Sequence, residues 1–454
     1  MALGPDIVVL IPGITGSVLE RNGKDVWATS AGAVLRGLFS RGDTIQDLRL
    51  GDDPPDVDDL GDGVTATKLV GDVHIFPGLW KIDGYGKVAK RLQQRLRLVP
   101  GETYFELPYD WRRDNRVAAR KLQRELGTWL GRRRQTHPEA KAVLIAHSMG
   151  GVIARYFIEV LGGAADTRAL ITFGTPYRGS LNALDSLVNG VEKLRVVDLT
   201  ELTRSFTSIH QLLPIYPCYA ESDASALIRL KEASELPGID VERVRAADAF
   251  HREIEQAVAD NQAAAGAGVE RYSIKPVVGI DQPTNQSARR DGDRVELLRS
   301  RDGDDESGDG TVPRVSATPI EAGEREAAFA ATRHASLQNA DAVLTHVHGV
   351  LTQPRDLGAI KAVGAPTTLS LDVDDLFLSD EPVRFAVRAS APGEALDAVV
   401  TNTETAAEKT LKLPPTDEDW RQAELAPLPP GTYRVTVTGD PTRVEPIADV
   451  FGVV

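Results

Sequence analysis

The chain has 454 residues, of which 42% are hydrophobic and 26% charged, as is typical of globular proteins with two or three domains. Its net charge of -14 argues against a nucleic-acid partner and against attraction to anionic lipid, so any transient membrane contact has to be apolar. The single cysteine, Cys218, allows no intrachain disulfide, and no apolar run reaches the ~20 residues of a membrane span. The sequence shows no signal peptide before the first strand pattern, so we expect a cytoplasmic location.

The chain begins with a buried strand at 6–11 that runs into the loop Pro12-Gly13-Ile14-Thr15-Gly16-Ser17. This loop is either a plain glycine-rich turn or the source of a backbone N–H for an oxyanion hole. Residues 20–84 show no sheet pattern, which predicts a lid or substrate-facing excursion. Trp27 and Trp80 of this segment either face substrate or pack in the core.

Helical and strand patterns then alternate. In chain order we predict a helix at 86–98, a strand at 104–107, a helix at 116–134, a strand at 142–146, a helix at 152–161 and a strand at 169–173. This alternation indicates a parallel sheet with helices on both faces.

Ser148 lies between a buried strand and a helix, within Ala146-His147-Ser148-Met149-Gly150. A serine at a strand-to-helix turn, with small residues two positions before and after it, is typical of a nucleophile elbow. The turn strains the serine backbone and holds the hydroxyl clear of the sheet at the positive end of the helix. An ordinary turn is the alternative, and Ala146 stands where a glycine is usual. We expect His147 to point away from the serine.

Residues 181–268 change to helices and irregular apolar stretches, which predicts either a cap over the catalytic end of the sheet or a structural helical layer. The pattern returns to strand at 271–280. A short run at 295–298 is a candidate hairpin strand, and a last strand at 327–331 precedes a closing helix at 337–351.

A nucleophilic serine needs a base, and the base needs an orienting acid; on an α/β-hydrolase sheet they follow in the order serine, acid, histidine. His334 follows the last predicted strand and is the candidate base. Two aspartates are candidates for the acid: Asp281 directly follows a strand, and Asp309 lies between two glycines. The acidic run 302–309 resembles a calcium loop only loosely, because the glycine of the sharp turn is missing.

From about residue 365 short alternating strands are separated by Pro, Gly and Asp, as at 369–373, 383–387 and 433–437. This pattern and its length of ~90 residues predict a β-sandwich. It carries no cluster of catalytic residue types, so we interpret it as an accessory packing or interaction module, whose protein partner is unidentified.

Six motifs occur in a specific order between Asp6 and Leu351: Pro12-Gly13-Ile14-Thr15-Gly16-Ser17, Pro108-Tyr109-Asp110-Trp111-Arg112, Ala146-His147-Ser148-Met149-Gly150-Gly151, Thr175-Pro176, Gly308-Asp309-Gly310-Thr311-Val312 and His334. Together they resemble the lecithin:cholesterol acyltransferase family, which includes lysosomal phospholipase A and phospholipid:diacylglycerol acyltransferases. The resemblance implies a lid, a cap and a lipid ester substrate.

By that resemblance Ser148 is the nucleophile, His334 the general base and acid, and Asp309 the orienting acid, while the backbone N–H groups of Ile14 and Met149 form the oxyanion hole. The sequence departs from the family in lacking the cysteines that clamp the membrane-binding region of secreted relatives, in lacking a secretion signal and in adding the C-terminal sandwich.

The sequence thus predicts an α/β-hydrolase domain at 1–362, with a lid or excursion at 20–84 and a cap at 181–268, followed by an Ig-like β-sandwich at 365–454. We expect a lipase, phospholipase or acyltransferase that acts on lipid acyl esters without cofactor or metal. The candidate substrate-binding residues are Trp27, Trp80, Trp111 and Tyr177. The alternatives are a non-lipid carboxylesterase of the same fold and a catalytically silent, partner-binding scaffold.

Overall fold

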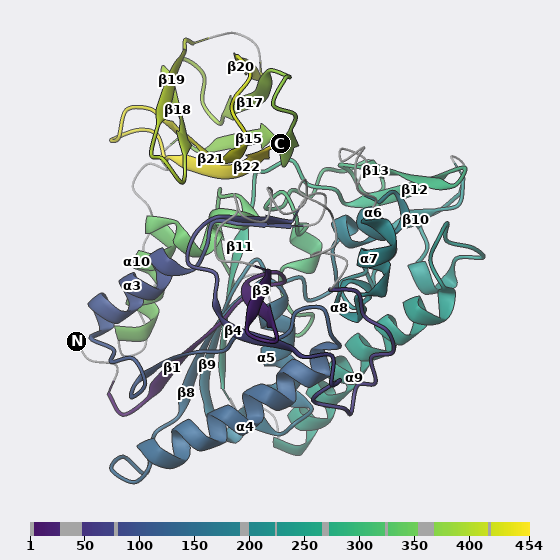
Figure 1. Cartoon of the computed structure of the whole chain (residues 1–454), viewed down its shortest axis with the longest axis vertical. Coiled ribbons are helices and arrows are strands. Elements are labelled where there is room, and N and C mark those ends of the chain that lie inside the picture. The colour runs from purple at the N-terminus through teal and green to yellow at the C-terminus, as the bar shows by residue number, and fades with distance from the viewer. Residues whose placement is uncertain are drawn as a thin grey trace.

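The computed structural model describes residues 4–27, 48–76, 80–190, 199–222, 225–265, 272–322, 326–352, 367–415 and 419–454. Within these ranges a parallel sheet flanked by helices is followed by a β-sandwich at the C-terminal end of the chain (Figure 1). No helix among the described residues is long and apolar enough to cross a membrane.

A six-stranded sheet organises the first domain, and all of its paired strands are parallel. Its strands, in spatial order, are β14 (Ala328–Ala330), β11 (Ser273–Gly279), β9 (Thr167–Phe173), β8 (Ala142–His147), β1 (Ile7–Ile11) and β7 (Tyr104–Glu106). Every residue of β1 and β8 is buried. The predicted α/β-hydrolase architecture is therefore confirmed.

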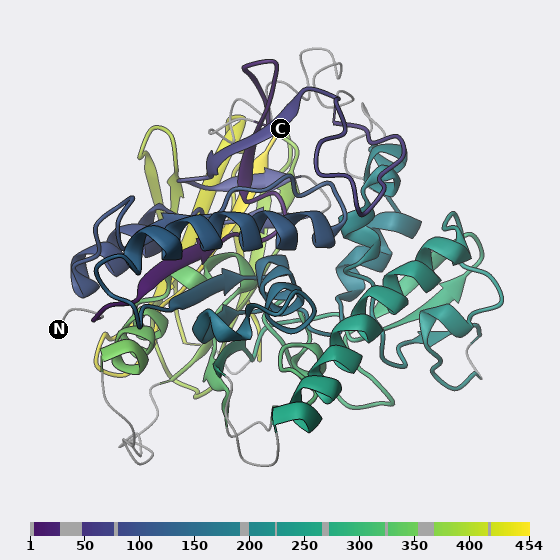
Figure 2. The same cartoon turned by 90° about the horizontal axis from the view of Figure 1, so that it is seen from below.

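Helices cover both faces of this sheet (Figures 1 and 2). Alternate residues of β1 show the two layers: Ile7 and Val9 pack with α4 (Asn115–Arg133) and α5 (Met149–Glu159), whereas Val8 packs with α3 (Gly86–Leu96) and α10 (Asp341–Thr352). Strands buried on both faces carry apolar residues continuously, which is why the sequence predicts them well.

The absence of sheet predicted for residues 20–84 is wrong for the described part of that segment. Three strands form a small antiparallel sheet, namely β2 (Ser17–Arg21), β3 (Lys24–Trp27) and β4 (Val64–Leu69), and β5 (His74–Phe76) pairs with β6 (Trp80–Ile82). These strands are short, and β3 and β4 are largely exposed, so they lack a long apolar run. Residues 28–47, on which much of the predicted lid falls, lie outside the described ranges.

The segment 181–268 is largely helical in its described part. It contains α6 (Leu181–Val188), α7 (Thr200–Ser205), α8 (Thr207–His210) and the long α9 (Val241–Ala265), together with β10 (Tyr219–Ala220). β10 joins a small sheet with β12 (Ser287–Asp291) and β13 (Arg294–Leu298), and the last two strands form the hairpin that the run at 295–298 indicates. Single 3₁₀ turns occur at Gly163–Ala165 (η1), Leu230–Glu232 (η2) and Arg314–Ser316 (η3).

The closing helix begins later than predicted. A 3₁₀ helix, η5 (His334–Asn339), precedes α10, because the side chains at its end bond to another element. The Gln338 amide donates to the carbonyl of Gly84 at 3.1 Å, and the Asn339 amide donates to that of Asp83 at 2.9 Å. Tertiary hydrogen bonds thus fix a tight turn where the apolar spacing alone indicates α-helix.

The C-terminal domain consists of two packed antiparallel sheets, as predicted for a β-sandwich. One contains β15 (Leu369–Val373), β17 (Val383–Ala389) and β20 (Arg421–Leu425), and the other contains β16 (Leu376–Phe377), β22 (Ile447–Val453), β21 (Gly431–Thr438), β18 (Leu396–Asn402) and β19 (Glu408–Leu413). β16 is the exception, because it pairs with β22 in parallel. The predicted boundary at 362–365 lies outside the described residues.

Candidate active site

Ser148 occupies a strained turn between β8 and α5. Its backbone angles are φ 52° and ψ -128°, a conformation that a non-glycine residue rarely adopts. A hydrogen bond from its N–H to the carbonyl of Phe173, at 2.9 Å, ties the turn to the end of β9. Gly150 is needed on the other side, because a Cβ there would lie 2.4 Å from the carbonyl oxygen of Pro12. The turn therefore has the geometry of a nucleophile elbow.

The structure brings Ser148, His334 and Asp309 together from three separate loops. The Nε2 atom of His334 lies 3.0 Å from the Oγ of Ser148, and its Nδ1 lies 2.7 Å from Oδ2 of Asp309. All three residues are at most 3% exposed. Because both ring nitrogens are in contact, the imidazole can take a proton from the serine on one side while the carboxylate holds the other.

Asp309 is held by the backbone on both sides. Its Oδ1 accepts hydrogen bonds from the N–H groups of Thr311 at 2.9 Å and Val312 at 2.7 Å, and its carbonyl accepts from the N–H of His334 at 2.8 Å. Gly174 lies against the pair, since a Cβ there would come within 2.6 Å of Asp309 Oδ2 and 2.8 Å of His334 Nδ1. The acid and the base are thus fixed relative to each other.

Asp281, the other candidate acid, lies elsewhere. It is exposed, and its backbone bonds to the Ser307 hydroxyl, which accepts from the Asp281 N–H at 2.6 Å. Its neighbour Gln282 donates its N–H to the carbonyl of Gly308 at 3.0 Å. Asp281 therefore follows β11 as predicted, but the imidazole of His334 faces Asp309.

The glycine-rich loop after β1 lies against the serine. A Cβ on Gly13 would be 2.8 Å from that of Ser148. The N–H of Gly13 donates to the Tyr85 hydroxyl at 2.7 Å and is therefore occupied, and Ile14 carries the next N–H of the loop. Met149 begins α5, where the first N–H groups have no partner within the helix. The structure thus places Ile14 and Met149 beside Ser148, and their role as donors stays a prediction.

Both ring nitrogens of His147 contact groups other than Ser148, in agreement with the expectation that this side chain points away from the serine. Its Nε2 lies 3.1 Å from the carbonyl oxygen of His334, and its Nδ1 lies 2.9 Å from the Tyr85 hydroxyl. Burial, together with the neighbouring His334, lowers the pKa of His147 well below its ordinary value, so the ring is neutral and has one N–H. A carbonyl only accepts, so that proton is on Nε2.

The remaining hydrogen-bond directions follow from this tautomer. The Tyr85 hydroxyl donates to Nδ1 of His147 and accepts from Gly13, so Gly13, Tyr85, His147 and His334 form one chain of donors and acceptors. This chain links the glycine-rich loop after β1 to the backbone of the candidate base. Position alone, directly before the serine, was the only sequence signal for His147, and Tyr85 had none.

The tryptophans proposed to bind substrate lie in the core. Trp27 and Trp111 are fully buried, pack edge to face at 5.5 Å, and donate their indole N–H groups to the carbonyls of Thr15 and Ser17. Trp80 is 5% exposed and belongs to the same core. Their position agrees with the packing alternative; Trp27 and Trp111 brace the glycine-rich loop from behind, and their contact with substrate stays a prediction.

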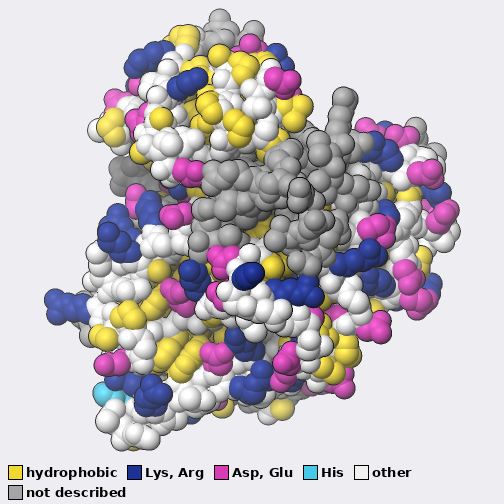
Figure 3. Space-filling model, viewed as in Figure 1, with side chains coloured by type: hydrophobic (Ala, Val, Ile, Leu, Met, Phe, Trp, Pro, Cys, Tyr) yellow, Lys and Arg dark blue, Asp and Glu magenta, His cyan; other side chains and the backbone are white. Residues whose placement is uncertain are grey.

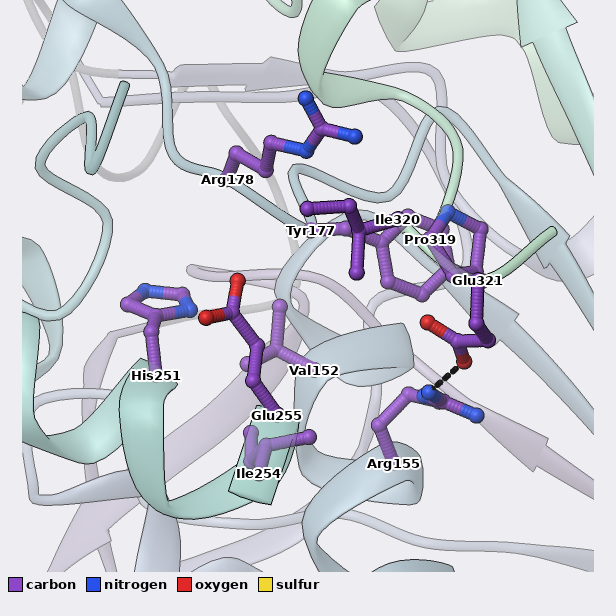
Figure 4. A pocket seen from close by; sticks show the side chains of 10 residues that line it. All are labelled: Val152, Arg155, Tyr177, Arg178, His251, Ile254, Glu255, Pro319, Ile320 and Glu321. Carbon is purple, nitrogen blue, oxygen red and sulfur yellow. Dashed lines mark hydrogen bonds and ion pairs between the residues drawn. The ribbon is translucent and has the colours of Figure 1, made fainter. Parts of the chain in front are cut away.

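Tyr177 lines a small cavity between the loop after β9 and α9 (Figure 4). Arg155 and Glu321 form an ion pair at the edge of this cavity, and the residues that line it do not include Ser148, Asp309 or His334. The Tyr177 hydroxyl lies 2.9 Å from that of Thr172. Nothing in this arrangement directs Tyr177 toward the serine.

Comparisons with known proteins give a family match and weak structural similarities. The family model described as Lecithin:cholesterol acyltransferase matches residues 51–255, and no curated protein matches the chain. The Bacillus licheniformis lipase BlEst2 in its propeptide form is 10% identical and covers 100% of this chain and 94% of its own, with a TM-score of 0.31. Its mature form is 12% identical, with coverages of 77% and 92% and a TM-score of 0.33.

A CARDB domain from Pyrococcus furiosus is 19% identical over 23% of this chain and 100% of its own, with a TM-score of 0.16. The family match is the informative comparison, because it includes the serine turn. It supports an acyltransferase or hydrolase of lipid acyl esters in general. Residues 51–255 therefore match the lecithin:cholesterol acyltransferase family model, in agreement with the resemblance that the motifs indicate.

Proposed function

We propose that the protein is a serine hydrolase or O-acyltransferase that cleaves lipid acyl esters, of the lipase or phospholipase class, through an acyl-enzyme on Ser148. The observation that carries the proposal is the pair of hydrogen bonds that joins Asp309 to His334 at 2.7 Å and His334 to Ser148 at 3.0 Å. A hydroxyl, an imidazole and a carboxylate in this order are the machinery of acyl transfer on several unrelated folds.

In the first half-reaction the Oγ of Ser148 attacks the ester carbonyl carbon, while Nε2 of His334 takes the hydroxyl proton. Asp309 holds Nδ1 and stabilises the imidazolium that forms. The carbonyl oxygen becomes an oxyanion, which accepts hydrogen bonds from the N–H groups of Ile14 and Met149; each such donor contributes ~3 kcal/mol in comparable sites. Collapse expels the alcohol, which leaves with the proton from His334.

In the second half-reaction a water or an acceptor alcohol gives its proton to His334 and attacks the acyl-enzyme. Ser148 is regenerated, and the product is a fatty acid or a new ester. Because the triad is buried, the charges that form during the reaction are stabilised by fixed protein groups rather than by water. Lipid as the substrate rests on the family match over residues 51–255.

A fluorophosphonate probe and a chain-length series of nitrophenyl esters test the proposal. We expect the probe to label the wild-type protein and not Ser148→Ala, and we expect long acyl chains to be cleaved faster than acetate. An unlabelled wild type contradicts the serine mechanism and favours a scaffold, whereas a clear preference for acetate favours a non-lipid carboxylesterase. Mass spectrometry of products from a mixed phospholipid and neutral lipid extract, with and without added alcohol, then separates hydrolysis from acyl transfer.

A further inference from the structure

The C-terminal sandwich contacts the two loops that carry Asp309 and His334. β22 and β15 lie on the side of the sandwich nearest the hydrolase sheet (Figure 1). The central contact is Asp449 of β22, which is fully buried and whose Oδ2 lies 2.8 Å from Nε of Arg333 and 2.8 Å from Nζ of Lys81. Arg333 directly precedes His334 in the chain. An anion from the second domain therefore holds the neighbour of the candidate base.

Arg333 also lies against the acid loop. A Cβ on Gly310 would be 2.5 Å from a terminal guanidinium nitrogen of Arg333, and Gly310 has φ +92°, so no side chain fits there without strain. Gly310 follows Asp309 directly. The Arg333 guanidinium, which pairs with Asp449, therefore lies beside the segment that carries Asp309 as well as the one that carries His334.

The carboxylate and the two cations of this contact are buried. Arg333 and Lys81 are 7% and 8% exposed. Burial alone would raise the pKa of Asp449, but Lys81 and Arg333 outweigh it and hold that pKa below its ordinary value. The carboxylate is therefore ionised, and removing its charge deprives Arg333 of this buried anion, whereas Lys81 keeps Asp375 at 2.8 Å. Because Arg333 adjoins His334 in the chain, a shift of Arg333 would act directly on the backbone of the candidate base.

A second contact reaches the acid loop from β15. The side chain of Gln282 is buried and bonds twice to the edge of β15: its amide donates to the carbonyl of Leu369 at 3.0 Å, and its amide oxygen accepts from the N–H of Leu371 at 3.0 Å. The backbone N–H of Gln282 donates to Gly308, immediately before Asp309. The sandwich thus extends a hydrogen-bonded path to each side of the acid–base pair.

Apolar packing supports the same junction. Val450 of β22 is fully buried in one cluster with Ala335, the residue after His334, and with Val73 and Ile75 of the β5 segment. His334 therefore has a sandwich contact on the residue before it and on the residue after it.

We propose that the sandwich is a positioning element for the triad, and that Asp449 is a positioning residue that keeps His334 in line with Ser148 and Asp309. This inference rests on the proposed function of the triad. It assigns the C-terminal domain a part in catalysis that needs no partner and no substrate contact. A domain that only adds stability would leave the turnover of the folded enzyme unchanged.

The test compares Asp449→Asn with Asp375→Asn in the full chain. The first removes the charge beside Arg333 and keeps the side-chain shape. The second removes a half-exposed sandwich carboxylate that pairs with Lys81 at 2.8 Å, at the same interface. For Asp449→Asn we expect kcat to fall roughly 10- to 100-fold with little change in KM, because a displacement of about 1 Å costs that much. We expect Asp375→Asn to keep the wild-type kcat.

Turnover is expressed per site titrated with the fluorophosphonate probe, so unfolded protein does not enter kcat. If wild type is active and Asp449→Asn shows the same kcat with only a lower melting temperature, the inference is wrong while the proposed function stands. If wild type itself neither labels nor hydrolyses esters, the proposed function fails instead.

Should Asp449→Asn not fold, Arg333→Lys decides in its place. The ammonium keeps the charge opposite Asp449 but has no planar fork to lie over Gly310. We expect a fall in kcat at unchanged KM, and a wild-type kcat in Arg333→Lys overturns the inference.

Discussion

At the scale of single residues, the proposed proton transfer from Ser148 depends on how each partner of His334 is held. The carboxylate of Asp309 accepts two backbone N–H bonds on one oxygen and contacts the imidazole with the other. The direction of the His334 ring is therefore set by the backbone of the acid loop as much as by the acid itself.

Asp309→Asn is expected to lower kcat by roughly four orders of magnitude, because an amide that donates to Nδ1 fixes the wrong tautomer of His334. Asp281→Asn, at an exposed position of the neighbouring loop, is the matched control and should keep near wild-type kcat. Rates of nitrophenyl ester hydrolysis measure both. The opposite ranking of the two variants would reassign the acid.

Tyr85→Phe removes the hydroxyl that joins Gly13 to His147. Two buried polar groups then lose their partner, which costs about 1–3 kcal/mol of stability each. We expect kcat to fall at least 10-fold, since the freed Gly13 loop no longer holds the oxyanion donors in place. Tyr104→Phe, which removes a buried tyrosine hydroxyl bonded to Glu106 at the far strand β7, is the control. Equal kcat values for the two variants would show that the chain through Tyr85 has no part in catalysis.

At the scale of elements, close contact between α5 and the glycine-rich loop defines the serine turn. Continuous apolar runs identify β1 and β8, because strands covered on both faces need apolar residues at every position. The small sheet of β2, β3 and β4 is missed, because its strands are short and partly exposed. The 3₁₀ helix that begins at His334 is also missed, since distant backbone groups fix its Gln338 and Asn339 side chains.

Two glycine-to-alanine changes distinguish the effect of a steric contact, at Gly150, from the effect of helix propensity, at Gly127. In Gly150→Ala the new methyl group meets the Pro12 carbonyl at 2.4 Å, so α5 must move away from the loop. We expect a loss of about 1–3 kcal/mol of stability and at least 10-fold in kcat. In Gly127→Ala, on the exposed face of α4, nothing lies within 4 Å, and stability should rise by up to about 1 kcal/mol. Thermal unfolding and ester hydrolysis check both, and an active, stable Gly150→Ala contradicts the assignment of a tight elbow.

At the scale of the whole molecule, the face seen in Figure 3 carries surface charges of both signs in its described part. Figure 3 shows Lys and Arg side chains interspersed with Asp and Glu over the described part of that face. This face therefore does not present the field of one sign that would steer a charged ligand over a long range. The titration of buried groups instead affects the folding stability of the whole molecule.

Buried histidines predict a loss of stability in mild acid. Burial lowers the pKa of His210 to about 4 and also lowers those of His147 and His251. Below about pH 6.5 the unfolded chain binds protons on these rings and the folded chain does not, so stability falls as the pH decreases. For His210 the loss is complete near pH 4 and is on the order of 3 kcal/mol.

In the wild type, Nδ1 of His210 lies 3.0 Å from the carbonyl oxygen of Phe206. His210→Asn tests the contribution of the imidazole, because the asparagine amide nitrogen can donate to the same carbonyl but does not titrate. We expect its unfolding free energy to decline less steeply than that of wild type between pH 6.5 and 4, with a constant offset at pH 8. Denaturant unfolding at a series of pH values measures the two curves. Parallel curves throughout would show that His210 does not resist protonation.

The sequence by itself determined the parallel sheet and the strand–turn–helix unit around Ser148, because these depend on local periodicity and on small residues at fixed spacing. It also placed the β-sandwich, whose strands alternate buried and exposed residues. Only the tertiary structure gave His147 and Tyr85 their place behind the glycine-rich loop, joined Asp449 to Arg333, and placed Asp309, which the family resemblance already favoured over Asp281, in contact with His334. Those pairings connect residues from 25 to 116 positions apart, and the distance and direction between such groups are set by packing, not by any pattern along the chain.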